Sequence, residues 1–266
     1  MGLAIPKQIL RSIGAIRLLD NMRYQFMKYK NRIDNKNFKS ENPNIAFPPD
    51  YLLYESHNIN YRFYIDNGKQ NARNLIELFQ KYTDLEGKNI LDWGCGPSRI
   101  IRHFPDLFPS TNVFGTDYNK NTIAWNKKHI KDVSFYENEI NPPTNFDDDF
   151  FHAIYGLSIF THLSEENHFN WINELHRISK VGAILILTTH GENYKIKLTK
   201  SDQVLYDANT LVVKGNTLEG HRTYVAYQPP QFMRQLFKDK FELLEHIPGP
   251  KDEDYLDQDK WVIKKI

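Results

Sequence analysis

The chain has 266 residues, of which 40% are hydrophobic and 25% charged, and its formal net charge is +1. This composition is typical of a globular protein with enough residues to bury a core, which excludes wholesale disorder. The near-zero charge excludes the strongly basic footprint of a dedicated nucleic-acid-binding protein, so no nucleic-acid partner is expected. The single cysteine, Cys95, excludes an internal disulfide and a structural zinc cage. With no 18-residue apolar run and no signal peptide, the chain is predicted to be cytoplasmic.

The first forty residues differ in charge from the rest of the chain. They carry nine basic and two acidic side chains, a net charge of +7, which leaves −6 for residues 41–266. Ile5, Ile9, Ile13 and Ile16 recur at helical spacing, which predicts a basic amphipathic helix. Two interpretations are open. The helix packs on its own domain or on a second subunit, or residues 1–40 contact a membrane surface or an acidic partner.

A break follows this helix, because Pro43, Pro48 and Pro49 interrupt regular structure. A second helix is predicted from residue 71 to residue 82, with Leu75 and Leu78 on one side. Residues 1–82 are therefore predicted to form an N-terminal basic helical segment and cap.

An alternation of strands and helices begins after residue 83. Apolar runs predict strands at 89–93, 111–116, 133–136, 151–155, 183–189, 241–247 and 261–264. Helices are predicted at 100–104, 122–129, 166–178 and 231–237. Continuous apolar strands separated by helices are typical of a parallel sheet covered on both faces. Residues 83–266 are thus predicted to form an α/β domain, a Rossmann-like doubly wound and mostly parallel sheet of seven strands. Residues 191–228, an insert without clear periodicity after the fifth strand, are predicted to be a lid over the acceptor.

The first predicted strand ends in Asp92-Trp93-Gly94-Cys95-Gly96. In open α/β sheets ligands bind beyond the carboxyl ends of the strands, and glycines there let the backbone approach a ligand closely. Asp117 ends the second strand, where a carboxylate can accept two hydrogen bonds from ribose hydroxyls. The pattern therefore predicts a cofactor that contains adenosine.

The same segment discriminates between two such cofactors. A nicotinamide dehydrogenase has a third glycine where this chain has Arg99, and a bulky residue there would crowd the helix against the strand. Asp92 would also repel a diphosphate, whereas it would attract a cation. S-adenosylmethionine has no phosphate and carries a sulfonium and an ammonium group, so the residues favour this cofactor.

These motifs resemble those of the class I S-adenosylmethionine-dependent methyltransferases. The run 90–99 is similar to their first motif, with Ser98 at the third glycine, and Gly115-Thr116-Asp117-Tyr118 is similar to their second. The resemblance implies that Asp92, Gly94 and Gly96 hold the methionine part, that Asp117 holds the ribose, and that S-adenosylhomocysteine is the product. The remaining cofactor-site residues that it implies are Tyr61, Tyr64, Cys95, Arg99, Tyr118, Asn138, Glu139, Leu157 and Ser158.

A narrower resemblance concerns the acceptor. Residues 160–166, 188–191 and 258–263 resemble methyltransferases encoded with bacterial capsule or O-antigen genes. This implies methyl transfer to an oxygen, on a sugar hydroxyl or a phosphate-type group, of a surface-polysaccharide precursor. The alternatives are an N-methyltransferase of a small amine or amino sugar and a cofactor-binding subunit without catalytic activity.

Two histidines follow predicted strands at the edge of the sheet where the cofactor is expected. His190 and His162 are the candidates for a general base that removes the acceptor's proton, with His190 preferred. Both are equally compatible with a structural role, and alignment of the reactants can suffice for methyl transfer. The candidates for the acceptor pocket come from the insert: His221, Arg222, Tyr224 and Tyr227. An ordinary surface hairpin is the alternative for these four.

No metal is expected. The segment after the fourth strand, 155–158, offers no cluster of hard oxygen ligands. The carboxylates at 147–149 precede that strand and are predicted to be a solvated loop, and residues 141–144 are predicted to be a turn.

Overall fold

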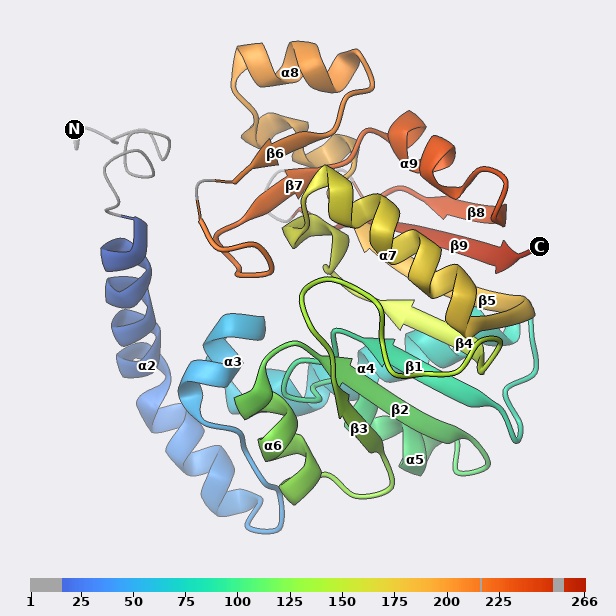
Figure 1. Cartoon of the computed structure of the whole chain (residues 1–266). Coiled ribbons are helices and arrows are strands. Elements are labelled where there is room, and N and C mark those ends of the chain that lie inside the picture. The colour runs from blue at the N-terminus through green and yellow to red at the C-terminus, as the bar shows by residue number, and fades with distance from the viewer. Residues whose placement is uncertain (1–15, 216, 251–255) are drawn as a thin grey trace.

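The computed structural model describes residues 16–215, 217–250 and 256–266 (Figure 1). Ile5, Ile9 and Ile13 of the predicted basic helix lie outside these residues. Seven strands form one sheet in the order β3-β2-β1-β4-β5-β9-β8. Their bounds are β1 Asn89–Trp93, β2 Asn112–Asp117, β3 Ser134–Glu137, β4 Phe151–Gly156, β5 Ser179–Thr189, β8 Phe241–Ile247 and β9 Asp259–Lys265.

The sheet is mostly parallel. β1 pairs in parallel with β2 on one side and β4 on the other, whereas β9 runs antiparallel to both β5 and β8. The predicted seven-stranded Rossmann-like fold is therefore confirmed. The chain leaves β1 in one direction and returns to β4 on its other side, so the edge beyond the carboxyl ends of β1 and β4 is the place where such sheets bind ligands.

Helices cover both faces of the sheet. α4 (Tyr61–Gln80), η1 (Ile101–His103), α5 (Phe104–Leu107) and α6 (Lys120–His129) contribute to the core on one face. α7 (Glu165–Ile178) and α9 (Pro230–Phe237) pack on the other. Neighbouring strand residues such as Ile90 and Leu91 point into opposite cores. β4 and the second half of β5 are largely apolar because both of their faces are buried.

Two predicted helices differ from the observed ones. α4 begins at Tyr61 and not at residue 71, because the Asn60 side chain accepts a hydrogen bond from the Phe63 N–H and caps the helix there. The first ten residues of α4 are mostly polar and give no apolar periodicity. The helix predicted at 100–104 is a 3₁₀ turn followed by the one-turn helix α5.

Residue 216 aside, the insert after β5 has regular structure of its own. It contains η3 (Glu192–Lys197), α8 (Lys200–Asp207) and a two-stranded sheet of β6 (Val212–Lys214) and β7 (Val225–Tyr227) (Figure 1). Leu198, Tyr206 and Val212 form its own small core. Its elements have eight residues or fewer, too short to produce a periodic signal in the sequence.

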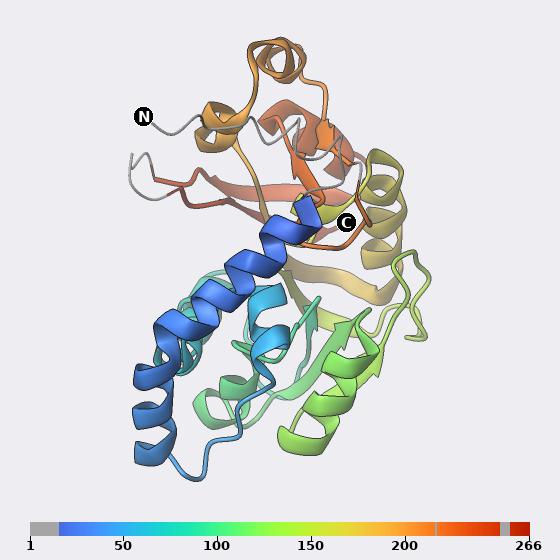
Figure 2. The ribbon, with the colours of Figure 1, turned by 90° about the vertical axis from the view of Figure 1, so that its left-hand side faces the viewer.

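The N-terminal helices lie along one side of the molecule (Figures 1 and 2). α2 (Ile16–Glu41) is joined by residues 42–49 to the short α3 (Asp50–Ser56). The Asn35 amide donates to the Ile59 carbonyl at 3.1 Å and accepts from the Tyr61 N–H at 2.9 Å. Between Ile16 and Ile266, leaving aside residues 216 and 251–255, no helix is long and apolar enough to cross a membrane.

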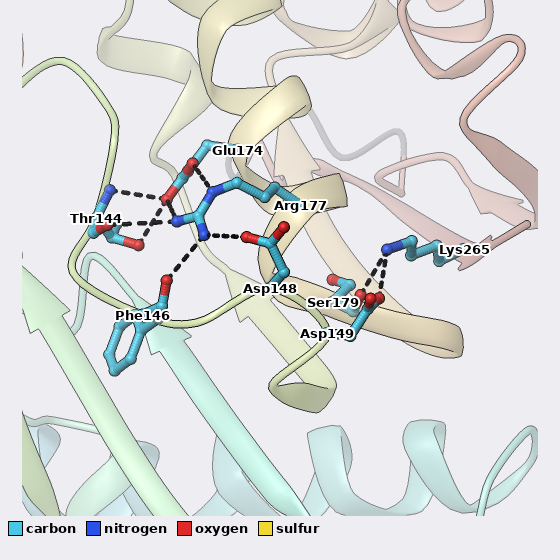
Figure 3. Close-up of polar contacts among 8 residues, drawn as sticks. All are labelled: Thr144, Phe146, Asp148, Asp149, Glu174, Arg177, Ser179 and Lys265. Carbon is cyan, nitrogen blue, oxygen red and sulfur yellow. Dashed lines mark hydrogen bonds and ion pairs between the residues drawn. The ribbon is translucent and has the colours of Figure 1, made fainter.

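The acidic run 147–149 lies at the opposite end of the sheet from the carboxyl end of β1. Asp148 and Asp149 are 73% and 57% exposed, but each is ion-paired, with Arg177 at 2.6 Å and with Lys265 at 2.8 Å (Figure 3). The run is therefore exposed as predicted, and it also fastens its loop to α7 and β9. The Lys265 ammonium additionally donates to the Ser179 carbonyl.

Candidate active site

The glycine-rich loop after β1 is shaped by left-handed backbone conformations. Gly94 has φ +76° and Gly96 has φ +50°, and Ser98 adopts φ +61° at the third glycine position. The N–H groups of Gly94 and Cys95 both donate to the Thr116 carbonyl, which binds the loop to the end of β2. A Cβ atom on Gly94 would lie 2.1 Å from Ile159 Cδ1, so the loop backbone forms the floor of the site without a side chain.

Asp117 faces this loop from the end of β2. Its carboxylate accepts hydrogen bonds from the Gly96 N–H at 2.9 Å and the Asn119 N–H at 2.8 Å. Burial raises the pKa of Asp117 to about 6, although the two backbone donors lower it. Asp117 is thus ionised at pH 7, and its carboxylate is held against the glycine-rich loop, as the predicted contact with ribose hydroxyls requires.

Asp92 occupies a different position, beneath the loop. Its carboxylate accepts a hydrogen bond from the Tyr155 hydroxyl at 2.9 Å and is 4% exposed. Burial raises the pKa of Asp92 to about 8, so this acid is neutral at pH 7 in the chain alone. Asp92 supports the loop from below. It is not among the residues that line the cleft, although its neighbour Trp93 is.

The cleft consists of two adjoining pockets beyond β1, β2 and β4. Both are lined by Gly94, Asp117, Tyr118, Ile159, His162 and Gly220. The inner pocket encloses about 430 Å³ between apolar walls that include Trp93 and Trp171, with Asn138 and Glu139 at its rim. Asn138 Oδ1 is buried there without a hydrogen-bond partner, as an acceptor for an adenine amino group would be. Asn138 and Glu139, two of the predicted cofactor-site residues, therefore lie at the inner pocket.

A turn of the insert closes this cleft. The Gly220 carbonyl accepts from the Tyr118 hydroxyl at 3.2 Å, and the Gly220 N–H donates to the His162 carbonyl at 2.9 Å. A Cβ on Gly220 would lie 2.4 Å from Ile140 Cδ1 in the wall of the inner pocket. The turn therefore packs against the pocket expected for adenosine, whereas the sequence suggested a lid over the acceptor.

The four insert residues predicted for the acceptor pocket are dispersed. Arg222 lines the outer pocket, donates to the Tyr54 carbonyl and stacks over the Tyr54 ring at 4.0 Å. His221 faces Glu55 at 3.2 Å. Tyr224 is 8% exposed, and Tyr227 lies 5.4 Å from the ring of His190. The structure does not bring these four side chains together around one cavity.

The two candidate bases are both neutral but differ in position. His162 lines both pockets of the cleft, and its Nδ1 lies 2.7 Å from the Tyr224 carbonyl. A carbonyl only accepts, so Nδ1 carries the proton and the neutral ring has its lone pair on Nε2. Burial lowers the pKa of His162. His190 stacks on Tyr194 at 4.0 Å, donates to the Ala226 carbonyl, and has its pKa lowered to about 4 by burial.

Four predicted cofactor residues act on the loop from outside the cleft or lie apart from it. The Tyr64 hydroxyl donates to the Pro97 carbonyl and steadies the loop from α4. Cys95 is buried and receives a weak hydrogen bond from Asn126 at 3.7 Å. Arg99 donates to Asn67 at 2.7 Å. Tyr61 instead bonds Asp50 and stacks on Phe47, away from the glycine loop.

A second, larger groove meets the cleft at Leu157 and Ser158, which line both. It encloses about 1360 Å³ between one face of α4 and the segment that leads into β9. Its polar lining includes Asn67, Asn71, Asn74, Arg99, Gln258 and Lys260. The three asparagines were not singled out from the sequence, although their spacing of four and three residues places them on one face of a helix.

Part of the chain matches a known protein family. Residues 90–182 match the model of a family described as a methyltransferase domain. This segment contains the glycine-rich loop, Asp117 and His162, so the match supports the predicted methyltransferase domain over this part of the chain. A malonyl-[acyl-carrier protein] O-methyltransferase of Bacillus cereus is 22% identical over 176 residues. The aligned region covers 62% of this chain and 61% of that curated relative.

Solved structures of methyltransferases share the fold. A methyltransferase from Methanosarcina mazei superposes with a TM-score of 0.54 at 18% identity, covering 71% of this chain and 97% of that one. The magnesium protoporphyrin IX methyltransferase of Synechocystis PCC 6803, solved with bound S-adenosylhomocysteine, gives a TM-score of 0.52 at 16% identity, with 81% and 92% covered. The match over residues 90–182 and the shared fold are consistent with the predicted cofactor, S-adenosylmethionine.

The residues of the cleft fit this cofactor. Gly94 leaves room for the ligand at the loop, Asp117 presents an ionised carboxylate, and Asn138 offers an unpartnered acceptor in the inner pocket. Metal independence stays a prediction. Among the residues that the structure describes, Asp20, Glu55 and His221 place one ligand atom each within 4.8 Å of one another. Their mutual contacts and the hydrogen bond from Tyr54 to Asp20 account for that cluster.

We expect Asp117→Asn to weaken S-adenosylhomocysteine binding roughly 10–100-fold, because a hydrogen bond to a charged group is worth about 1.5–3 kcal/mol. In the unchanged protein the affinity should also fall as the pH drops through about 6, where Asp117 takes up a proton. Titration calorimetry between pH 5 and 8 measures both effects. The exposed Asp106→Asn serves as the control. If the Asp117→Asn protein bound S-adenosylhomocysteine with the same pH dependence as the unchanged protein, Asp117 would not be the residue that binds the ribose.

Proposed function

We propose that this methyltransferase transfers the methyl group to a hydroxyl oxygen of a sugar, as in a precursor of a bacterial surface polysaccharide. The observation that carries the proposal is the amide-lined groove that opens onto the cofactor cleft at Leu157 and Ser158. Amide side chains both donate and accept hydrogen bonds, which matches the hydroxyl groups of a sugar.

Hydrogen bonds fix polar side chains on each wall of the groove. The Gln258 carbonyl oxygen accepts from the hydroxyls of Ser158 and Thr188, at 3.0 and 2.6 Å. Gln258 is thereby fixed where the groove joins the cleft. On the other wall the Asn67 carbonyl accepts from Arg99 and from Asn71. An acceptor in the groove would find a preorganised polar lining.

His162 is the side chain best placed to accept the proton that the hydroxyl loses. It is neutral because burial lowers its pKa, and its Nδ1–H is engaged by the Tyr224 carbonyl. Bound S-adenosylmethionine supplies an electrophilic methyl group. The chain's own part is to align the hydroxyl and to exclude water, which α3 and the turn at Gly220 do at the mouth of the cleft. His190, with its pKa lowered to about 4, is a weaker base than the sequence suggested.

Transfer to oxygen is also supported by the curated relatives, which are O-methyltransferases by name. Their acceptor is a malonyl group on a carrier protein, and an acidic acceptor would find Arg99 and Lys260 in the groove. We favour a sugar because the groove offers more amide groups than cationic ones.

The proposal is tested with labelled S-adenosylmethionine and a panel of nucleotide sugars, phosphorylated sugars, amino sugars and small amines. We expect label on a sugar oxygen. Asn71→Leu should raise the acceptor KM about tenfold while the affinity for S-adenosylhomocysteine stays unchanged, since one lost hydrogen bond costs about 1–1.5 kcal/mol.

The control variant is Gln80→Leu, an exposed amide at the end of the same helix. Turnover of amines alone would make the protein an N-methyltransferase. Cofactor binding without turnover of any member of the panel would favour the subunit without catalytic activity.

A further inference from the structure

The helix α2 carries an apolar stripe on its outer surface. The stripe consists of Leu18, Met22, Phe26, Tyr29 and Ile33, whose side chains are 60–64% exposed. Steps of three and four residues place all five on one side of the helix. Figure 2 looks onto α2, which lies across the near surface of the molecule. An exposed, contiguous apolar surface of this kind marks an interaction site.

The side of α2 that faces the protein is held largely by polar contacts. Asn31 and Asn35 are each 8% exposed, and they bond Asn60, Ile59 and Tyr61. Nearer the N-terminal end, the Asp20 carboxylate accepts from the Tyr54 hydroxyl at 2.8 Å. Phe38 adds an apolar contact close to the C-terminal end. The hydrogen bonds fix the rotation of α2 about its axis, so the apolar stripe is presented outward by the fold itself.

Basic residues flank the stripe on both sides. At 100° per residue, Arg23 and Lys30 lie along one edge, and Arg32 and Lys36 lie along the other. All four are exposed. Asp34 is the one acid beside the stripe in the described part of α2, because Asp20 faces inward and Glu41 is paired with Arg62. The surface thus combines an apolar centre with cationic edges.

The inner side of α2 packs on its own domain, and this combination favours a membrane surface over a second copy of the chain as the partner of its outer side. Two copies of α2 that paired through the stripe would bring their cationic edges together, and like charges at close range oppose that contact. An anionic lipid surface instead neutralises the cations while its acyl boundary takes up the apolar side chains. The stripe runs over about 22 Å of helix, enough to lie in the plane of such a surface.

We propose that α2 binds an anionic membrane surface, with the apolar stripe inserted into the interface and Arg23, Lys30, Arg32 and Lys36 against the lipid headgroups. The proposal is independent of the acceptor, because lipid binding is measured without methyl transfer.

The test is sedimentation of the full chain with vesicles of phosphatidylcholine alone or mixed equally with phosphatidylglycerol. We expect binding to the mixed vesicles and at least tenfold weaker binding to phosphatidylcholine. The triple variant Met22→Ser, Phe26→Ser, Ile33→Ser should lose at least 100-fold in partition, since each buried apolar side chain contributes about 1.5–3 kcal/mol. The variant Arg23→Gln, Lys30→Gln, Lys36→Gln should lose roughly 100-fold on mixed vesicles, from about 1 kcal/mol per cation near the surface.

The matched control removes three equally exposed apolar side chains elsewhere, in the variant Val181→Ser, Ile196→Ser, Val204→Ser. It should bind the mixed vesicles as the unchanged protein does. A thermal shift with S-adenosylhomocysteine confirms that each variant is folded. Failure of the unchanged chain to bind mixed vesicles overturns the proposal. A dimer that the stripe variant converts to monomer, without vesicle binding, would identify a second copy of this chain as the partner.

Discussion

Gly94→Val is expected to abolish cofactor binding. Valine at this position would have to adopt φ +76° and would place its Cβ 2.1 Å from Ile159 Cδ1 and 2.8 Å from Ile159 Cγ1. Ile159 lines both pockets of the cleft, so its displacement would close the space that the ligand needs. At 100 times the dissociation constant, S-adenosylhomocysteine stabilises a binding protein by about 2.7 kcal/mol. That corresponds to roughly 5–10 °C in Tm for a domain of this size, and the variant should show less than 1 °C.

The matched control is Gly182→Val. Gly182 has a similar backbone angle, φ +81°, but no atom lies within 4 Å of the Cβ that would be added. This variant therefore carries the backbone strain, about 1–2 kcal/mol, without the clash. It should unfold at a lower temperature yet keep the full ligand-induced shift. A normal shift in the Gly94→Val protein would show that the glycine loop does not contact the cofactor.

Arg177→Met is expected to lower the stability of the fold by about 3–5 kcal/mol, the cost of leaving a buried ion without its partner. Glu174 is 4% exposed on its side chain and bonds Arg177 at 2.7 Å, while the Thr144 N–H donates to the same carboxylate oxygen (Figure 3). Burial favours the neutral acid, but the hydrogen bonds from Arg177 and Thr144 prevail and lower the pKa of Glu174. Without Arg177 this charge is left buried. Tm should fall by roughly 2–4 °C per kcal/mol.

Two further variants separate this effect from simple loss of an ion pair. Arg62→Met breaks the pair between Arg62 and Glu41, whose side chains are 60% and 58% exposed. It should cost no more than about 1 kcal/mol. The double variant Arg177→Met, Glu174→Leu removes the buried charge as well and should recover part of the lost stability. If both arginine variants cost the same, the cluster in Figure 3 contributes no more than a surface pair.

The cofactor side of the site was largely predictable from the sequence. The glycine loop and Asp117 each follow an apolar run, and the carboxyl ends of parallel strands meet at one edge of the sheet. The positions of the glycine-rich loop and Asp117 at the ends of successive strands therefore predict that they lie close together. The sequence did not show that Asp92 is buried. Its position just before the glycine-rich loop suggested a contact with the ligand. The Tyr155 hydroxyl from β4 holds it beneath the loop.

The histidines illustrate the same division. His162 and His190 both follow strands at the same edge of the sheet, and the sequence favoured His190 as the base. The structure separates them because the turn at Gly220 closes over His162 and the cleft, whereas Tyr194 and Tyr227 stack around His190. Contacts with the insert decide this, and the insert's short elements carry no periodic signal.

The sequence by itself predicted the fold class and the cofactor, because both depend on local patterns of apolar, glycine and charged residues. Only the tertiary structure decided which side chains face one another across a cleft and which face the solvent. The groove needs one face of α4 opposite Gln258 and Lys260, which lie far away in the chain. The outward direction of the apolar stripe depends on two hydrogen bonds with the segment before α4, one that Asn31 accepts from Asn60 and one that Asn35 donates to Ile59. Periodicity defines the faces of a helix, but long-range contacts select the face that is buried.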